Sequence, residues 1–105
     1  MIRAKKRYLL YKVEGQVLDE RSCRNAVTSA VYIFLGEKGA SEANVKFMGF
    51  DAAKQAFFLR CALGSLESTI AAIALQTSFN AKPIALRLEK MSGSVKHVWE
   101  SQRKP

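Results

Sequence analysis

The sequence has few of the residues that interrupt helices and strands, form disulfide bonds or bind metal ions. Its 105 residues include six glycines, two prolines, two cysteines and one histidine. The scarcity of glycine and proline, together with 49% hydrophobic residues, predicts a single packed domain over 1–105, with short basic termini. Cys23 and Cys61 match no metal or redox spacing, so we predict reduced, buried thiols.

No apolar run approaches the roughly 20 residues that a membrane-spanning helix needs, so no membrane association is predicted. The first residues carry cations but no signal-peptide core.

Recognisable catalytic constellations are also lacking. His97 has no second histidine, cysteine or carboxylate at metal-ligand spacing, so we predict neither a metal site nor a catalytic histidine. Val13, Gly15 and Val17 fit the start of an acylphosphatase-like phosphate loop, but Asp19 and Glu20 would repel a phosphate there. No nucleophile has a base to activate it, so the chain has no predicted active site.

Positive charge is abundant and concentrated at the two ends. The formal net charge is +8, from 17 lysines and arginines and nine acids. Residues 1–12 contribute +5 and residues 87–105 contribute +3, whereas residues 13–86 hold seven charges of each sign. A basic surface of this kind is typical of proteins that bind a polyanion.

The first half of the chain predicts a strand, a helix and a hairpin. The aromatic and β-branched segment 8–14 predicts a strand that ends at Gly15. Asp19 then fits the N-cap of a helix that Gly36 terminates. Segments 45–50 and 56–61 predict two strands joined by a turn. The apolar stripe of the helix consists of Cys23, Val27, Ala30, Val31 and Phe34.

The second half predicts a helix, a strand and a short last helix. Gly64-Ser65 begins the second helix and Asn80 closes it. Pro83 stands at the front of a strand over 84–89, and residues 92–94 cap the last helix. The inward-facing residues of the second helix are Leu66, Ile70, Ile73, Ala74 and Thr77, and the last helix carries Val95, Val98 and Trp99.

This order of elements predicts an α+β fold of the ferredoxin-like or RRM-like type, βαββαβ with an extra C-terminal helix. Right-handed crossovers give an antiparallel sheet with strand order 4-1-3-2, which places the two basic ends side by side. Both faces of this sheet are apolar, and the two helices cover only one. One face carries Leu9, Tyr11, Val13, Phe57 and Leu59, and the other carries Tyr8, Leu10 and Phe58. The uncovered face needs the last helix with Trp99, a protein partner or stacked bases to cover it.

Sequence-specific recognition by an RRM-type sheet is one hypothesis. Laid on the third strand, the RNP1 pattern lacks its glycine and its first and last stacking rings, where Gln55, Ala56 and Cys61 stand. Tyr8 and Phe58 remain as rings that could each stack a base. One candidate function is therefore that of a free-standing protein that binds single-stranded RNA on its sheet face; it is kept as the alternative to the function considered next. A small-molecule regulatory domain is disfavoured by the uneven charge.

Five short segments, in order along nearly the whole chain, carry a more specific resemblance. They are Lys5–Tyr8, Leu35–Gly39, Phe50-Asp51, Arg60-Cys61 and Ser92–Lys96. Through them the chain resembles the small RRM-like protein subunit of archaeal and eukaryotic ribonuclease P, the protein component 2 family. Phe57 departs from the pattern, because glycine is common there in the family.

The resemblance implies a non-catalytic subunit of a ribonucleoprotein that removes the 5′ leader from precursor tRNA. The ribonuclease P RNA performs the hydrolysis with Mg²⁺, and the protein itself binds no cofactor. The implied partners are that RNA, a TIM-barrel-like protein subunit, a second copy in a heterotetramer, and precursor tRNA only indirectly. The implied compartment is the archaeal cytoplasm, or the nucleus for a eukaryotic source.

The resemblance and the charge pattern together predict two sets of site residues. Residues 92–94 would contact phosphate through backbone N–H groups, although a simple helix cap is an equal alternative. The predicted RNA contacts are Arg3, Lys5, Lys6, Arg7, Lys90, Ser92, Gly93, Ser94 and Lys96. The residues predicted for the sheet face or a protein partner are Tyr8, Leu10, Phe58 and Trp99.

Overall fold

The computed structural model describes residues 5–79 and 81–92. The predicted last helix with Trp99, and Asn80 as the end of the second helix, lie outside these residues. The elements are β1 (Lys6–Glu14), α1 (Glu20–Ala43), β2 (Lys46–Asp51), β3 (Ala56–Ala62), the 3₁₀ turn η1 (Leu63–Ser65), α2 (Leu66–Ala74), β4 (Ser78–Phe79), β5 (Lys82–Pro83) and β6 (Ala85–Ser92).

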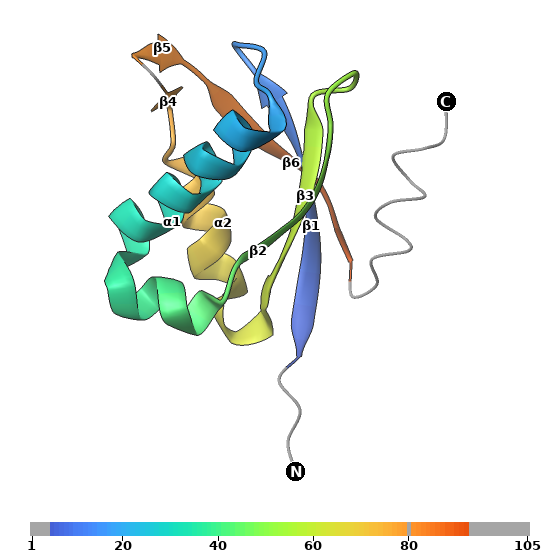
Figure 1. The fold of residues 1–105 in the computed structure, drawn as a ribbon. Helices are drawn as coiled ribbons and strands as arrows, with labels where there is room; N and C mark the ends of the chain where they lie inside the picture. The colour runs from blue at the N-terminus through green and yellow to red at the C-terminus, as the bar shows by residue number, and fades with distance from the viewer. Residues whose placement is uncertain (1–4, 80, 93–105) are drawn as a thin grey trace.

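The main sheet has four antiparallel strands in the order β2-β3-β1-β6. With β6 as the fourth main strand, this is the predicted order 4-1-3-2. Helices α1 and α2 lie together on one side of the sheet (Figure 1). The predicted α+β fold of the RRM-like type is therefore confirmed.

The core lies between the sheet and the two helices. Leu9, Tyr11 and Val13 of β1 belong to it, as do Phe57 and Leu59 of β3. The ring of Phe57 stacks on that of Tyr11, with 5.3 Å between the centroids. These residues occupy the sheet face predicted for them, because successive strand residues point to opposite faces.

Helix α1 does not end at Gly36, contrary to the sequence prediction. Gly36 leaves helical geometry, with φ 74° and ψ 176°, and the chain then resumes a helix to Ala43. Ala40 and Ala43 are buried, so burial on the core stabilises this second half. Phe34, predicted to be buried, is 42% exposed, whereas the rest of the predicted stripe is buried.

Helix α2 is shorter than predicted and turns a slightly different face to the core. Ala74 and Thr77, predicted to face inward, are exposed, and Thr77 lies beyond the helix. Thr69 and Ala72 are buried instead, alongside Ile73. The sequence prediction missed the small β4–β5 hairpin, which occupies the region assigned to the end of the helix. Pro83 consequently lies in β5 rather than at the front of β6.

Both cysteines are free and buried, as predicted. Burial raises the pKa of the Cys23 thiol to about 12 and also raises that of Cys61, so both thiols are protonated at neutral pH. Among the described residues, no helix combines the length and the apolar character that crossing a bilayer requires.

Candidate nucleic-acid interface

The sheet brings the start of β1 and the end of β6 together at one end of the molecule. The start of β1 pairs with the end of β6, so that Tyr8 lies opposite Ser92 and Leu10 lies opposite Lys90. Lys5 and Lys6 precede Tyr8 and therefore lie at this same end. The predicted neighbourhood of the first and last strands is confirmed.

Backbone contacts fix the start of β1 within the fold. The carbonyl oxygen of Lys5 accepts a hydrogen bond from the N–H of Leu63 at 2.8 Å, which ties this segment to η1. Arg7 Nη1 donates to the carbonyl oxygen of Lys6 at 2.9 Å. Lys5 is exposed, whereas Lys6 and Arg7 are partly buried. The cations are thus attached to an ordered strand rather than to a free tail.

The predicted RNA contacts do not all share one face of the sheet. Lys6 alternates with Arg7, and Arg7 lies on the side of Leu9, which faces the helices. Lys6 lies on the side of Tyr8 and Leu10, which faces away from the helices. The predicted contacts that lie outside the described residues are Arg3, Gly93, Ser94 and Lys96.

A small apolar cluster occupies the face away from the helices. Leu10, Ala56 and Phe58 form it, with Tyr8 and Met48 packed against them. Phe58 and Leu10 are each only 6% exposed, so little of the Phe58 ring lies on the accessible surface. Tyr8 is partly buried. The structure therefore brings three of the four predicted sheet-face residues together, and Trp99 lies outside the described residues.

Two further cations lie in line with Tyr8 across the sheet and were absent from the predicted site. Arg60 on β3 is directly opposite Tyr8, and Lys46 on β2 is directly opposite Arg60. Phe47 and Leu59, which pair next to them, face the core, so Lys46 and Arg60 face away from the helices. We call Lys46, Arg60, Tyr8 and Ser92 the cross-strand row.

Sequence reasoning missed Lys46 and Arg60 because they lie in the segment whose charges sum to zero. Arg60 was noted only as part of the Arg60-Cys61 resemblance. The register of the hairpin would have placed both residues in line with Tyr8, but a bulge at Met48 shifts that register between Phe47 and Gly49. Adding these two residues to the predicted site would therefore have required knowledge of the strand pairing, because their residue types alone do not place them there.

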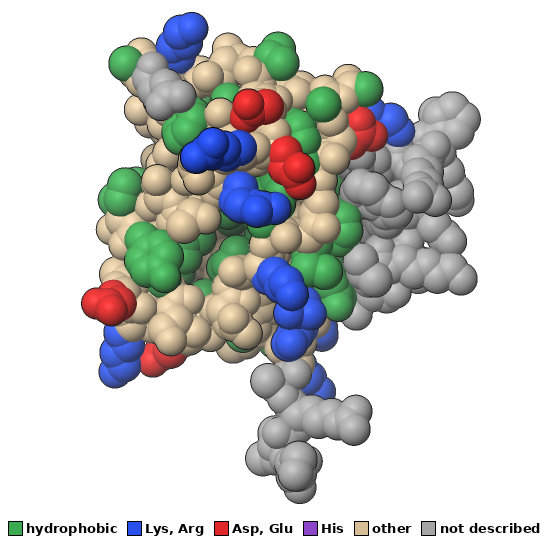
Figure 2. Space-filling view, viewed as in Figure 1, with side chains coloured by type: hydrophobic (Ala, Val, Ile, Leu, Met, Phe, Trp, Pro, Cys, Tyr) green, Lys and Arg blue, Asp and Glu red, His purple; other side chains and the backbone are tan. Residues whose placement is uncertain are grey.

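The two ends of the sheet differ in electrostatics. At the far end, Arg87 is paired with Glu14 at 3.1 Å and with Glu89 at 3.0 Å. At the end that holds Lys5, Lys6 and Lys90, the described residues form no salt bridge. Figure 2 shows cationic side chains beside the point where the N-terminus leaves, without an acidic neighbour on the described part of that face. This end carries uncompensated positive charge.

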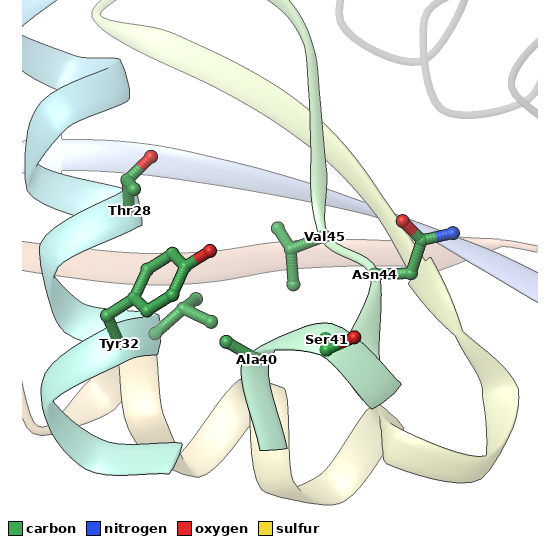
Figure 3. Close-up of a pocket in the computed structure, with 7 residues that line it drawn as sticks. Thr28, Tyr32, Ala40, Ser41, Asn44 and Val45 are labelled. Atoms are coloured by element: carbon green, nitrogen blue, oxygen red, sulfur yellow. The ribbon is translucent and has the colours of Figure 1, made fainter. Parts of the chain in front are cut away.

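A separate hollow lies beside the kink of α1 (Figure 3). Thr28 and Tyr32 border it from the first half of the helix, and Ser41 and Asn44 border it from the second half and its end. The residues that line it carry no charge, so the hollow offers a phosphate no cation. Tyr32 and Ile33 are 55% and 68% exposed at this kink.

Side chains that could ligate a metal ion are dispersed in the part of the chain that the structure describes. No three His, Cys, Asp or Glu side chains there lie close enough together to hold a metal ion. What the arrangement offers is an ordered cationic surface around a partly buried tyrosine, which is suited to a polyanion.

Comparison with known proteins agrees with this arrangement. The model of the Rpp14/Pop5 family matches residues 7–102. The chain belongs to the Rpp14/Pop5 family. The resemblance to ribonuclease P protein component 2 is thereby confirmed, because relatives of that name match 94% of the chain. The relative from Methanosarcina barkeri is 33% identical over 101 residues, which cover 73% of its length. The relative from Methanosarcina mazei is 30% identical over 100 residues, which cover 84% of its length.

A solved structure shares the fold of this Rpp14/Pop5 chain. A chain in the cryo-EM structure of yeast ribonuclease MRP superposes with a TM-score of 0.71 over 97% of this chain and 94% of that one. The two sequences are 13% identical, so the likeness concerns the fold.

Proposed function

We propose that this chain is a non-catalytic protein subunit of ribonuclease P, which binds the RNA subunit and stabilises it for removal of the 5′ leader from precursor tRNA. Membership of the Rpp14/Pop5 family carries the proposal, because the relatives that match nearly the whole chain are ribonuclease P proteins. The cationic end of the sheet supplies a physical basis, because a folded RNA brings many phosphates close together.

In this proposal the protein contributes charge and shape rather than chemistry. Lys5, Lys6 and Lys90 offset the repulsion between phosphates near the catalytic region, and the RNA with Mg²⁺ hydrolyses the phosphodiester bond. A TIM-barrel-like protein subunit and a second copy of this chain are the proposed protein partners. The cytoplasm is the proposed compartment, in line with relatives from Methanosarcina.

The alternative of a free-standing RRM-type protein has less support. Base stacking on the sheet needs exposed rings, and Phe58 is only 6% exposed. Tyr8 alone, partly buried, offers at most one stacking position among the rings considered for this role.

Affinity purification of the tagged chain from its native cell at moderate salt tests the proposal. We expect one dominant structured RNA, a TIM-barrel-like protein and cleavage of precursor tRNA at the 5′ leader in the eluate. An untagged strain is the control for RNA that adheres to the resin. A spread of short or messenger RNAs without cleavage activity would refute the proposal in favour of the free-standing RNA-binding protein.

A further inference from the structure

The side chain of Arg60 is incompletely satisfied in the structure. Its Nε is buried, and it has no hydrogen-bond partner among the described residues. A guanidinium stays charged in a protein, and a buried N–H without an acceptor reduces stability. Arg60 as a whole is only partly buried. An acceptor from another molecule therefore reaches the terminal Nη groups of the guanidinium rather than the buried Nε.

The surroundings of Arg60 are cationic. Lys46 lies directly opposite it on β2, and Lys6 lies two residues before its other cross-strand neighbour, Tyr8. None of Lys6, Lys46 and Arg60 has an acidic partner within salt-bridge distance among the residues that the structure describes. Arg87, on the same face at the far end, contacts two carboxylates. The anion that balances the near end therefore comes from outside the described chain.

We propose that Arg60, Lys46 and Lys6 form a binding site for the sugar–phosphate backbone of RNA where it crosses the end of the sheet from β2 towards β6. The proposal rests on the proposed function for the identity of the ligand, and it adds residues of the cross-strand row to that function. Arg60 presents N–H groups in a planar fork that suits two phosphate oxygens, and the lysines act as point charges.

The extent of the cationic surface favours a nucleic-acid backbone over a single carboxylate. From Lys46 to Lys90 the surface crosses three strand spacings, which is about 14 Å. Cations distributed over this length match a chain of successive phosphates, whereas one carboxylate would occupy only the position beside Arg60. Contacts of this kind position the RNA without reading its sequence.

Salt-dependent binding of the full chain tests this site. Dissociation constants would be measured against salt concentration for two RNAs, the ribonuclease P RNA of the same organism and an unrelated duplex of matched length. The variants are Arg60→Gln, Lys46→Gln and Arg60→Lys. Lys82→Gln on β5 is the matched control, because it removes one exposed cation outside the main sheet. Lys46 is exposed, so its replacement leaves the core unchanged.

We expect Arg60→Gln and Lys46→Gln each to lower the slope of log affinity against log salt by about 0.7–0.9 and to weaken binding about tenfold at 0.1 M salt. Arg60→Lys should retain the slope and bind a few-fold more weakly, because the charge remains and the fork is lost. Lys82→Gln should behave as wild type.

The two proposals fail in different ways. If wild type does not prefer ribonuclease P RNA, the proposed function fails, and the slope on the duplex still decides the site. Wild-type slopes for Lys46→Gln and Arg60→Gln on both RNAs would overturn the site. If those variants instead lose a co-purifying protein subunit, Arg60 binds a carboxylate of that protein and the RNA site is rejected.

Discussion

At the scale of single residues, Gln55 shows why this chain departs from an RNP1 pattern. Its Oε1 accepts a hydrogen bond from the N–H of Leu18 at 2.8 Å, and its Nε2 donates to the carbonyl oxygen of Leu18 at 3.0 Å. Its own carbonyl oxygen accepts from the N–H of Val13 at 2.8 Å. The glutamine thus joins the β2–β3 hairpin to the segment between β1 and α1, a structural task that glycine could not perform.

Tyr11 carries a buried hydroxyl that contributes nothing favourable to the described structure. The residue is 2% exposed, and its Oη has no hydrogen-bond partner among the described residues. We expect Tyr11→Phe to raise the free energy of unfolding by about 1 kcal/mol, because the stacked ring remains and a desolvated hydroxyl is removed. Urea denaturation measures this change. Tyr32→Phe is the matched control and should be neutral, because Tyr32 is 55% exposed.

The same substitution should change the dependence of stability on pH. Burial, and secondarily the negative charge of an ionised Cys61, raise the pKa of Tyr11 above the ordinary value of 10.0. The unfolded chain therefore ionises first, so ionisation of Tyr11 leaves the stability of the wild type unchanged well below pH 10 and lowers it as the pH rises further. The stability advantage of Tyr11→Phe should widen between pH 9 and 11. A constant difference over that range would contradict the assignment of a buried, unpaired hydroxyl.

At the scale of elements, the kink in α1 depends on two glycines with different roles. Gly36 adopts φ 74° and ψ 176°, a region that is essentially restricted to glycine. Gly39 allows a close approach, because a Cβ there would lie 2.9 Å from the Cβ of Leu35. The kink lets one helix cover the core with Val31 and then again with Ala40.

We expect Gly36→Ala to lower the free energy of unfolding by about 1–3 kcal/mol. A Cβ at Gly36 would meet no atom within 4 Å, so the cost is backbone strain alone. Gly64→Ala is the matched control, because its Cβ also meets open space and its backbone lies outside the left-handed region. That variant should be neutral or slightly stabilising. Equal stability of the two variants in urea denaturation would show that the kink is not strained.

The elements also show which parts of the fold can be predicted from sequence. The alternation of Leu9, Tyr11 and Val13, and the helical spacing of Cys23 and Val27, are local signals, and the structure places these residues as expected. The continuation of α1 was not predictable, because Gly36 resembles an ordinary helix end. The second half of the helix depends on burial against distant elements. The β4–β5 hairpin is likewise too short to leave a periodic pattern.

At the scale of the whole molecule, the fold converts an uneven distribution of charge along the sequence into an uneven distribution of charge over the surface. The charge count alone predicted that both ends are basic, and the strand order predicted that they meet. The prediction could not assign Lys46 or Arg60 to that surface, because their positions depend on the register of β2 with β3. Residues 13–86 have no net charge in sequence, but two of their cations, Lys46 and Arg60, lie on the basic surface in the fold.

This surface predicts the outcome of removing the N-terminal cations. Replacing Lys5, Lys6 and Arg7 by alanine should reduce the salt slope for ribonuclease P RNA by about 2–3, because each phosphate contact contributes 0.7–0.9. The fold should persist, since the hydrogen bond from Leu63 goes to the backbone of Lys5. Fluorescence titration at several salt concentrations, with circular dichroism as a check of folding, measures both quantities.

The matched control for this triple variant removes the same charge elsewhere. Arg21, Lys38 and Lys82 are exposed and lie on α1 and β5, outside the main sheet. Their replacement by alanine leaves the same net charge as the N-terminal triple variant. A local interface predicts that only the N-terminal variant loses slope, whereas attraction by net charge alone predicts equal losses. Equal losses would mean that RNA senses the total charge of the protein and not the end of the sheet where β1 begins and β6 ends.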